Sequence, residues 1–170
     1  MTIDDAIREA LRYERKVLAV YREAVAVCAD PVGQAVFRSL GDEEQGHVDY
    51  LEAKLAEWKA EGAVAPGEVT TVLPGEDDVA DKLAQTLRDH PTKGAQDPEL
   101  EYLKRALEAE TETSAFYERM VAELPAEGKA LFAPFLNIER AHRSLVQAEI
   151  DALTGTGFWF DVAEFRFEAG

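Results

Sequence analysis

Cysteine, basic residues and long apolar runs are all scarce in this sequence. Cys28 is the only cysteine among 170 residues, so the chain can form neither an internal disulfide nor a four-cysteine metal site. Eighteen lysines and arginines face 34 acidic residues, giving a net charge of −16. Nucleic acid and anionic membranes require a basic surface, so neither is expected as a partner. No apolar run approaches the roughly 20 residues of a membrane span, and the first residues do not resemble a secretion signal. We therefore expect a cytoplasmic protein.

Helix signals dominate the chain, and the clearest strand-like stretch is VTTVL at 69–73. Thr2 with Asp5 is typical of a capping pair. Asp30-Pro31 and Asp97-Pro98 each place a cap residue before a proline at the first helical position. Leu124-Pro125 marks a further break. These signals predict helices over about 3–29, 31–60, 98–123 and 126–153.

Two further segments lie outside these helices. The connection over about 61–97 is long for a loop, and its middle, DDVADKLAQTLRDH, is compatible with a short additional helix. The tail 154–170 is rich in aromatic residues, and we expect it to pack on the helices or against another subunit. Residues 1–153 are expected to form one domain, with a kink at Pro134.

The chain repeats itself. Residues 10–26 align with residues 106–122 at an offset of 96. Phe37, Glu44 and His47 then align, at an offset of 95, with a second set: Phe132, Glu139 and His142. Two similar helical hairpins joined by a long crossover between the second and third helices predict an all-α four-helix bundle.

Each helix carries an apolar seam that polar residues interrupt near its middle. Apolar residues recur at alternating steps of three and four, which is the pattern of a buried helix face. The interrupting residues are Glu14, Glu44, His47, Glu110, Glu139 and His142. Counted from the hairpin turns at about 1.5 Å per residue, they lie at the same level of the bundle within about one turn. The six side chains are therefore expected to meet in the core.

Four carboxylates in a core require compensation. Desolvating one ion costs several kcal/mol, and like charges repel each other. Two divalent cations would balance four carboxylates while both histidines stay neutral. Carboxylate and imidazole ligands suit iron or manganese. The pattern predicts a site for two metal ions, which are iron or manganese.

These residues resemble the ligand set of the ferritin-like di-iron carboxylate proteins. The chain is most similar to their rubrerythrin-like branch, on three features: the phrase DEEQGHVDYL, the step of about 30 residues between ligand helices, and a tyrosine seven residues after each lone glutamate (Tyr21 and Tyr117). The resemblance covers about residues 3–153. It implies a ferritin-like bundle in which Glu44 and Glu139 bridge two irons, while each remaining ligand serves one iron.

The resemblance also implies a function. A rubrerythrin-like oxidoreductase oxidises Fe(II) while it reduces hydrogen peroxide or dioxygen, a reaction that belongs to the response to oxidative stress. The chain lacks the paired Cys-x-x-Cys motifs of a rubredoxin-type site, so an external electron donor such as a rubredoxin-type protein is expected. Thr113 stands where rubrerythrins carry an additional glutamate ligand, which puts the full peroxidase activity in question.

Two other functions are compatible with the same residues. One is a ferroxidase that delivers iron to a storage assembly. The other is a non-catalytic helical interaction module in which the metal ions only stabilise the bundle. The tyrosine hydroxyls are expected either to contact ligand carboxylates or to serve as core aromatics. Cys28 lies on an apolar face and is expected to be a core residue. A homodimer is the expected assembly.

Overall fold

The computed structural model describes residues 1–73, 75, 78, 81, 98–156 and 159. Its four helices within that part of the chain are α1 (Ile3–Val27), α2 (Pro31–Glu61), α4 (Pro98–Glu123) and α5 (Ala126–Thr156). They confirm the four predicted helices, with ends displaced by at most three residues. Residues 69–73 form no strand. Most of the possible helix at 77–90, the Asp97 cap and most of the tail 154–170 lie outside the described residues.

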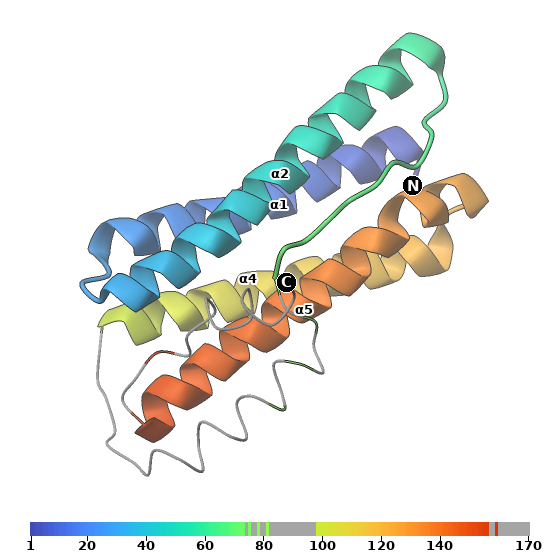
Figure 1. Cartoon of the computed structure of the whole chain (residues 1–170). Coiled ribbons are helices and arrows are strands. Elements are labelled where there is room, and N and C mark those ends of the chain that lie inside the picture. Colours follow the sequence, from blue (N-terminus) through green and yellow to red (C-terminus); the bar gives the residue numbers. More distant parts are fainter. Residues whose placement is uncertain (74, 76–77, 79–80, 82–97, 157–158, 160–170) are drawn as a thin grey trace.

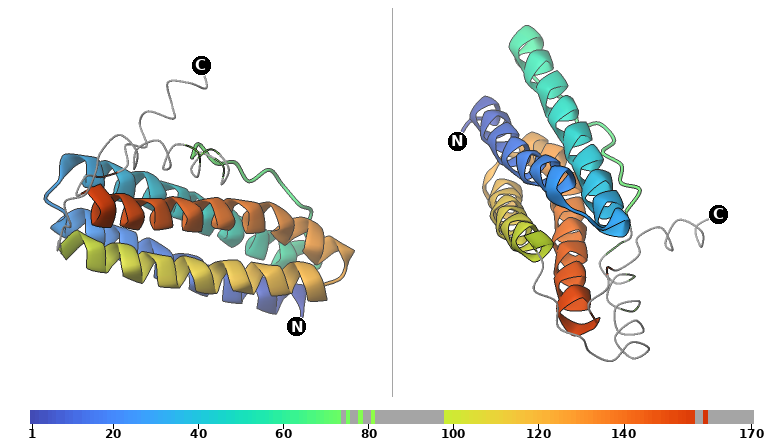
Figure 2. Two further views of the ribbon diagram at one scale, coloured as in Figure 1. Left: turned by 90° about the horizontal axis from the view of Figure 1, so that it is seen from below. Right: turned by 90° about the vertical axis from the view of Figure 1, so that its left-hand side faces the viewer.

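The helices form a bundle of two hairpins (Figures 1 and 2). Helix α1 packs on α2, α4 packs on α5, and the hairpins join along α1 and α4. This arrangement confirms the all-α four-helix architecture. In the described part of the chain, no helix is both long enough and apolar enough to cross a membrane.

The helix ends follow from local hydrogen bonds. At the start of α1, the Thr2 hydroxyl accepts from the Asp5 N–H at 3.2 Å, and the Asp5 carboxylate accepts from the Thr2 N–H at 3.3 Å. Asp30 caps α2 by accepting from the Val32 N–H at 2.7 Å. Helix α2 ends at Glu61 and is capped by Gly62, whose φ of 70° is a left-handed conformation that glycine adopts without strain. Thus both predicted caps within the described residues are confirmed.

Two apolar clusters fill the bundle, one toward each end. Phe37, Leu40 and Leu103 are fully buried in one cluster, whereas Phe116 and Phe132 are fully buried in the other. Burying such a side chain contributes about 1.5–3 kcal/mol. In every helix the predicted polar residues lie between a segment whose apolar side chains belong to one cluster and a segment whose apolar side chains belong to the other. The clusters therefore enclose the middle of the bundle from both ends.

Two predicted features of the C-terminal region bear on this core. Helix α5 runs through Pro134 without interruption. Trp159 packs edge-on against Phe37, with ring centroids 5.2 Å apart.

The Cys28 side chain is buried in the same cluster as Phe37, as its apolar seam predicts.

Candidate metal centre

Six acidic and imidazole side chains from all four helices converge in the middle of the bundle. Each of the six residues is at most 2% exposed to solvent. We call the set the centre, and its members are Glu14 from α1, Glu44 and His47 from α2, Glu110 from α4, and Glu139 and His142 from α5. Their positions in the helical seams bring them together, as the sequence predicts.

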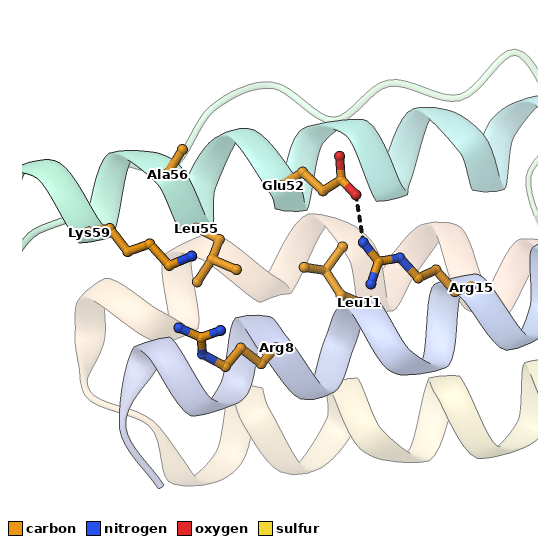
Figure 3. A pocket seen from close by; sticks show the side chains of 7 residues that line it. All are labelled: Arg8, Leu11, Arg15, Glu52, Leu55, Ala56 and Lys59. Carbon is orange, nitrogen blue, oxygen red and sulfur yellow. Dashed lines mark hydrogen bonds and ion pairs between the residues drawn. The ribbon is translucent and has the colours of Figure 1, made fainter.

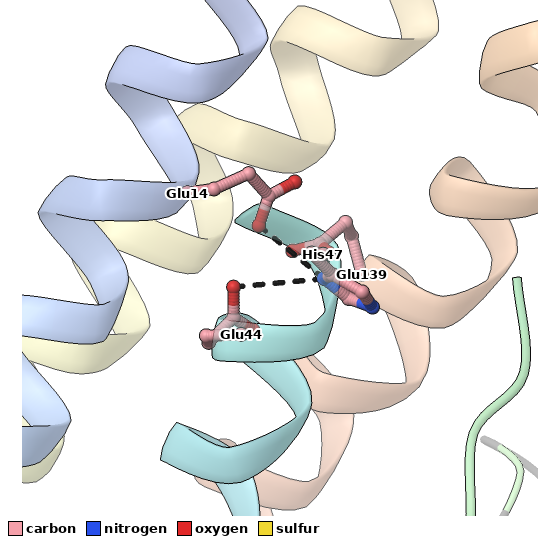
Figure 4. A group of neighbouring side chains, drawn as sticks. All are labelled: Glu14, Glu44, His47 and Glu139. Atoms are coloured by element: carbon pink, nitrogen blue, oxygen red, sulfur yellow. Dashed lines mark hydrogen bonds and ion pairs between the residues drawn. The ribbon is translucent and has the colours of Figure 1, made fainter. Parts of the chain in front are cut away.

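The centre divides into two overlapping groups. In each group, one ligand atom per residue lies within 4.8 Å of the others. Figure 4 shows the first group, which contains Glu14, Glu44, His47 and Glu139. The second group contains Glu44, Glu110, Glu139 and His142. Glu44 and Glu139 belong to both groups, so the geometry offers two neighbouring positions for a metal ion with two shared carboxylates.

Each histidine turns its Nδ1 atom toward the carboxylates. His47 Nδ1 lies 3.3 Å from Glu14 Oε2 and 3.2 Å from Glu139 Oε1. His142 Nδ1 lies 2.8 Å from Glu44 Oε1. The two imidazole rings are stacked, with centroids 5.6 Å apart. The Nδ1 atoms are thus the imidazole nitrogens that face the two metal positions.

Two tyrosines link the hairpins at the centre. The hydroxyl of Tyr21 donates to Glu110, and the hydroxyl of Tyr117 donates to Glu14. Each bond joins one hairpin to the lone glutamate of the other. Burial, reinforced by the neighbouring carboxylates, raises the pKa of both tyrosines well above the ordinary value. Both hydroxyls therefore keep their protons near neutral pH and orient the carboxylates that accept them.

Burial dominates the electrostatics of the carboxylates. It raises the pKa of Glu44, and the charge of Glu14 raises it further. Burial and the charge of Glu44 likewise raise the pKa of Glu110. For His47, burial lowers the pKa, but the surrounding carboxylates outweigh it. A cluster of this kind carries an excess of buried negative charge that cations would offset.

Several buried oxygens in the centre have no hydrogen-bond donor. These atoms are Glu44 Oε2, Glu110 Oε2 and both carboxylate oxygens of Glu139. His47 Nδ1 approaches Glu139 Oε1 at ion-pair distance, but without the alignment of a hydrogen bond. Buried polar atoms are normally paired, and unpaired ones mark strain, an ion or a function. Hard oxygen donors with two imidazoles fit iron or manganese, so the residues present fit a pair of such ions.

Glu43 contacts the centre, although the seam pattern did not reveal it. Its Oε2 atom lies 3.1 Å from Nε2 of His142, on the far side of that ring from the centre. Burial raises the pKa of Glu43, but hydrogen bonds, led by that from His142, outweigh it and lower the pKa. A carboxylate on the second nitrogen of a histidine orients the ring toward a metal. The only indication of this role in the sequence is that Glu43 directly precedes the candidate ligand Glu44 in DEEQGH.

Thr113, where the resemblance would place an additional glutamate, is fully buried. Its hydroxyl donates to the backbone carbonyl of Ala109 at 2.9 Å, which occupies its donor within α4. The centre therefore has no carboxylate at this position.

A separate groove of about 490 Å³ lies on α1 and α2 (Figure 3). Arg8, Arg15 and Lys59 line it together with apolar residues, and Arg15 pairs with Glu52 at 2.6 Å. No residue of the centre lines this groove.

No protein-family model matches the sequence, and no match was found among curated proteins or solved structures. The rubrerythrin-like resemblance and the roles that it implies therefore remain predictions.

Proposed function

We propose that the protein is a ferritin-like di-iron oxidoreductase that reduces hydrogen peroxide or dioxygen. The observation that carries the proposal is the pair of overlapping groups sharing Glu44 and Glu139. Two ferrous ions held there would supply the two electrons that, with two protons, convert one hydrogen peroxide to two waters. Iron is favoured over manganese by the resemblance in sequence.

The chain's own residues would hold and shield the metal pair. Glu44 and Glu139 would bridge the ions, His47 and His142 would each bind one through Nδ1, and the lone glutamates would complete the two positions. The tyrosine hydroxyls would keep Glu14 and Glu110 in one orientation. The apolar clusters on either side limit access of water to the centre. Re-reduction would require an external electron donor, because the chain has no second redox motif.

The test is anaerobic ferrous loading followed by one equivalent of hydrogen peroxide or dioxygen. Mössbauer spectroscopy measures oxidation of bound iron, and a peroxide electrode measures its consumption. We expect oxidation of both irons by at least one oxidant, and a loss of this reaction in the Glu44→Ala variant. Bound ferrous iron that reacts no faster than free ferrous iron would contradict the proposal.

Iron storage is the second candidate, because a net charge of −16 attracts cations. Storage requires a closed shell of subunits and more than two irons per chain. Size-exclusion chromatography with iron analysis after repeated aerobic loading distinguishes the two functions. A small assembly, such as the expected homodimer, holding only two irons per chain would exclude storage by this protein alone.

A further inference from the structure

A cavity of about 420 Å³ lies between α2 and the segment 68–72, beside the centre. We call it the α2 cavity. Its polar lining includes Asp42, Glu43, His47, Glu68 and Thr70. None of the described residues that line it is a lysine or arginine. The α2 cavity is therefore a negatively charged recess, and such a recess concentrates cations.

His47 connects the α2 cavity to the centre. The residue is 2% exposed and lines the cavity, and its Nδ1 faces the carboxylates. Its Nε2 atom is buried and has no hydrogen-bond partner. Figure 4 shows the two ring nitrogens on opposite sides, one toward Glu14 and Glu44 and the other away from them. A cation in the cavity can bind this unpartnered imidazole nitrogen in exchange for any proton that it carries.

The internal repeat explains why Nε2 of His142 has a hydrogen-bond partner and Nε2 of His47 has none. Glu43 occupies Nε2 of His142. The position that corresponds to Glu43 in the second hairpin, at the offset of 95, is Ile138, which cannot accept a hydrogen bond. The repeat therefore supplies a carboxylate partner to His142 and none to His47. Only the His47 side of the centre combines a free nitrogen with an adjoining acidic cavity in the described structure.

The outer wall of the α2 cavity is held in place by hydrogen bonds. The Glu43 carboxylate accepts from the Val72 N–H at 2.7 Å and from the Thr71 hydroxyl at 2.6 Å. The hydroxyl of Tyr50 accepts from the Gly67 N–H at 2.8 Å. The segment is thus fixed at both ends of the cavity, and the recess is preformed.

We propose that the α2 cavity is the entry site for divalent cations, where Asp42, Glu68 and Nε2 of His47 receive an ion before it moves to the centre. This inference rests on the proposed metal centre, and it adds a route and a loading site. Asp42 and Glu68 are exposed and form no ion pair with another described residue. Their charges are available to an incoming cation.

Stopped-flow loading of the metal-free protein with Co²⁺, followed by the visible absorption of bound cobalt, tests the role of charge. The test variant is Asp42→Asn/Glu68→Gln. The control is Glu61→Gln/Glu108→Gln, which makes the same change in net charge at exposed residues outside the cavity. We expect the test variant to load at least about threefold more slowly than the control at low ionic strength. The difference should shrink in ~1 M salt, where the screening length is about 3 Å.

A steric variant tests the route independently of charge. Gly46 lines the α2 cavity, and a Cβ atom there meets no atom within 4 Å, so a side chain fits without a clash at its base. Gly46→Leu fills part of the recess, and Gly46→Ala is its control. We expect the leucine variant to load several-fold more slowly, while both bind two Co²⁺ per chain at equilibrium.

The outcomes separate this inference from the proposed function. Two Co²⁺ per chain with slower loading in both test variants would support the entry route. Loading at the control rate in either comparison would overturn the route and leave the centre intact. A wild type that binds no Co²⁺ would contradict the centre itself, and the route with it.

Discussion

Replacing Glu139 by glutamine should change stability in opposite directions with and without metal. Glutamine keeps the size of the side chain and removes its charge. Glu139 belongs to both groups of the centre, and neither of its oxygens has a hydrogen-bond donor. In the metal-free protein its charge adds to a buried negative excess. In the metal-bound protein the same charge would bridge the two ions.

The magnitude follows from the distances. The ligand atom of Glu139 lies within 4.8 Å of those of Glu14, Glu44 and Glu110. At an effective dielectric constant of about 20, each such pair repels by about 3.5 kcal/mol, or roughly 10 kcal/mol for all three. The raised pKa values of His47 and His142 favour their charged forms. The attraction between Glu139 and His47, whose Nδ1 lies at 3.2 Å, is about 5 kcal/mol. The attraction to His142, within 4.8 Å, is about 3.5 kcal/mol, so the two histidines together offset about 9 kcal/mol of the repulsion. The remaining repulsion predicts that Glu139→Gln stabilises the metal-free protein by about 1–2 kcal/mol.

Metal reverses this sign. Each ion present at ~100 times its Kd stabilises the folded state by about 2.7 kcal/mol, so two ions contribute about 5 kcal/mol. Glu139→Gln should lose most of this increment. Urea unfolding followed by circular dichroism, with EDTA and then with excess Co²⁺, measures both values. Glu149→Gln is the control, because Glu149 is fully buried in the same helix and belongs to neither group. It should keep the metal-dependent increment. A Glu139→Gln variant that gains as much from metal as the wild type would refute the reasoning.

Three further predictions concern residues around the centre. Tyr117→Phe removes a buried donor to a carboxylate and should destabilise the protein by about 1.5–3 kcal/mol in urea unfolding; Tyr13→Phe, at a half-buried tyrosine, should change it by less than about 0.5 kcal/mol. Glu43→Gln should weaken metal binding about 10-fold or more in a Co²⁺ titration, because it alters the support of the α5 histidine; unchanged affinity would contradict that support. Burial raises the pKa of the Cys28 thiol to about 12, so the folded protein should react with a thiol reagent at pH 8 far more slowly than the urea-unfolded chain. Equal rates would contradict its burial.

The sequence predicted the six residues of the centre because two independent regularities agree on them. Helical periodicity places all six residues in buried seams, and their distances from the hairpin turns, which the repeat makes alike in both hairpins, place them at one level. In a bundle of straight helices, a position along the chain translates directly into a height. The helix boundaries were predictable from their caps for the same local reason, as at Thr2 and Asp30.

The contacts between hairpins were not predictable in the same way. Tyr21 could have bonded to either lone glutamate or to neither, and only the packing of α1 on α4 decides that it reaches Glu110. Glu43 precedes a ligand and lies off the apolar seam, so periodicity assigns it to a solvated face. Its partners, His142 and residues 71–72, are distant in sequence. The α2 cavity likewise depends on the path of residues 68–72, for which the sequence offers only a weak strand signal.

The central claim is that the bundle holds two metal ions between its four helices. Elemental analysis after anaerobic ferrous loading, with wild type and Glu44→Ala compared, tests it most directly. We predict two irons per wild-type chain and clearly fewer than two in the variant, because Glu44 belongs to both groups. Little or no bound iron in a folded wild type would contradict the account, since the buried carboxylates would then have to be compensated by protons and histidines alone.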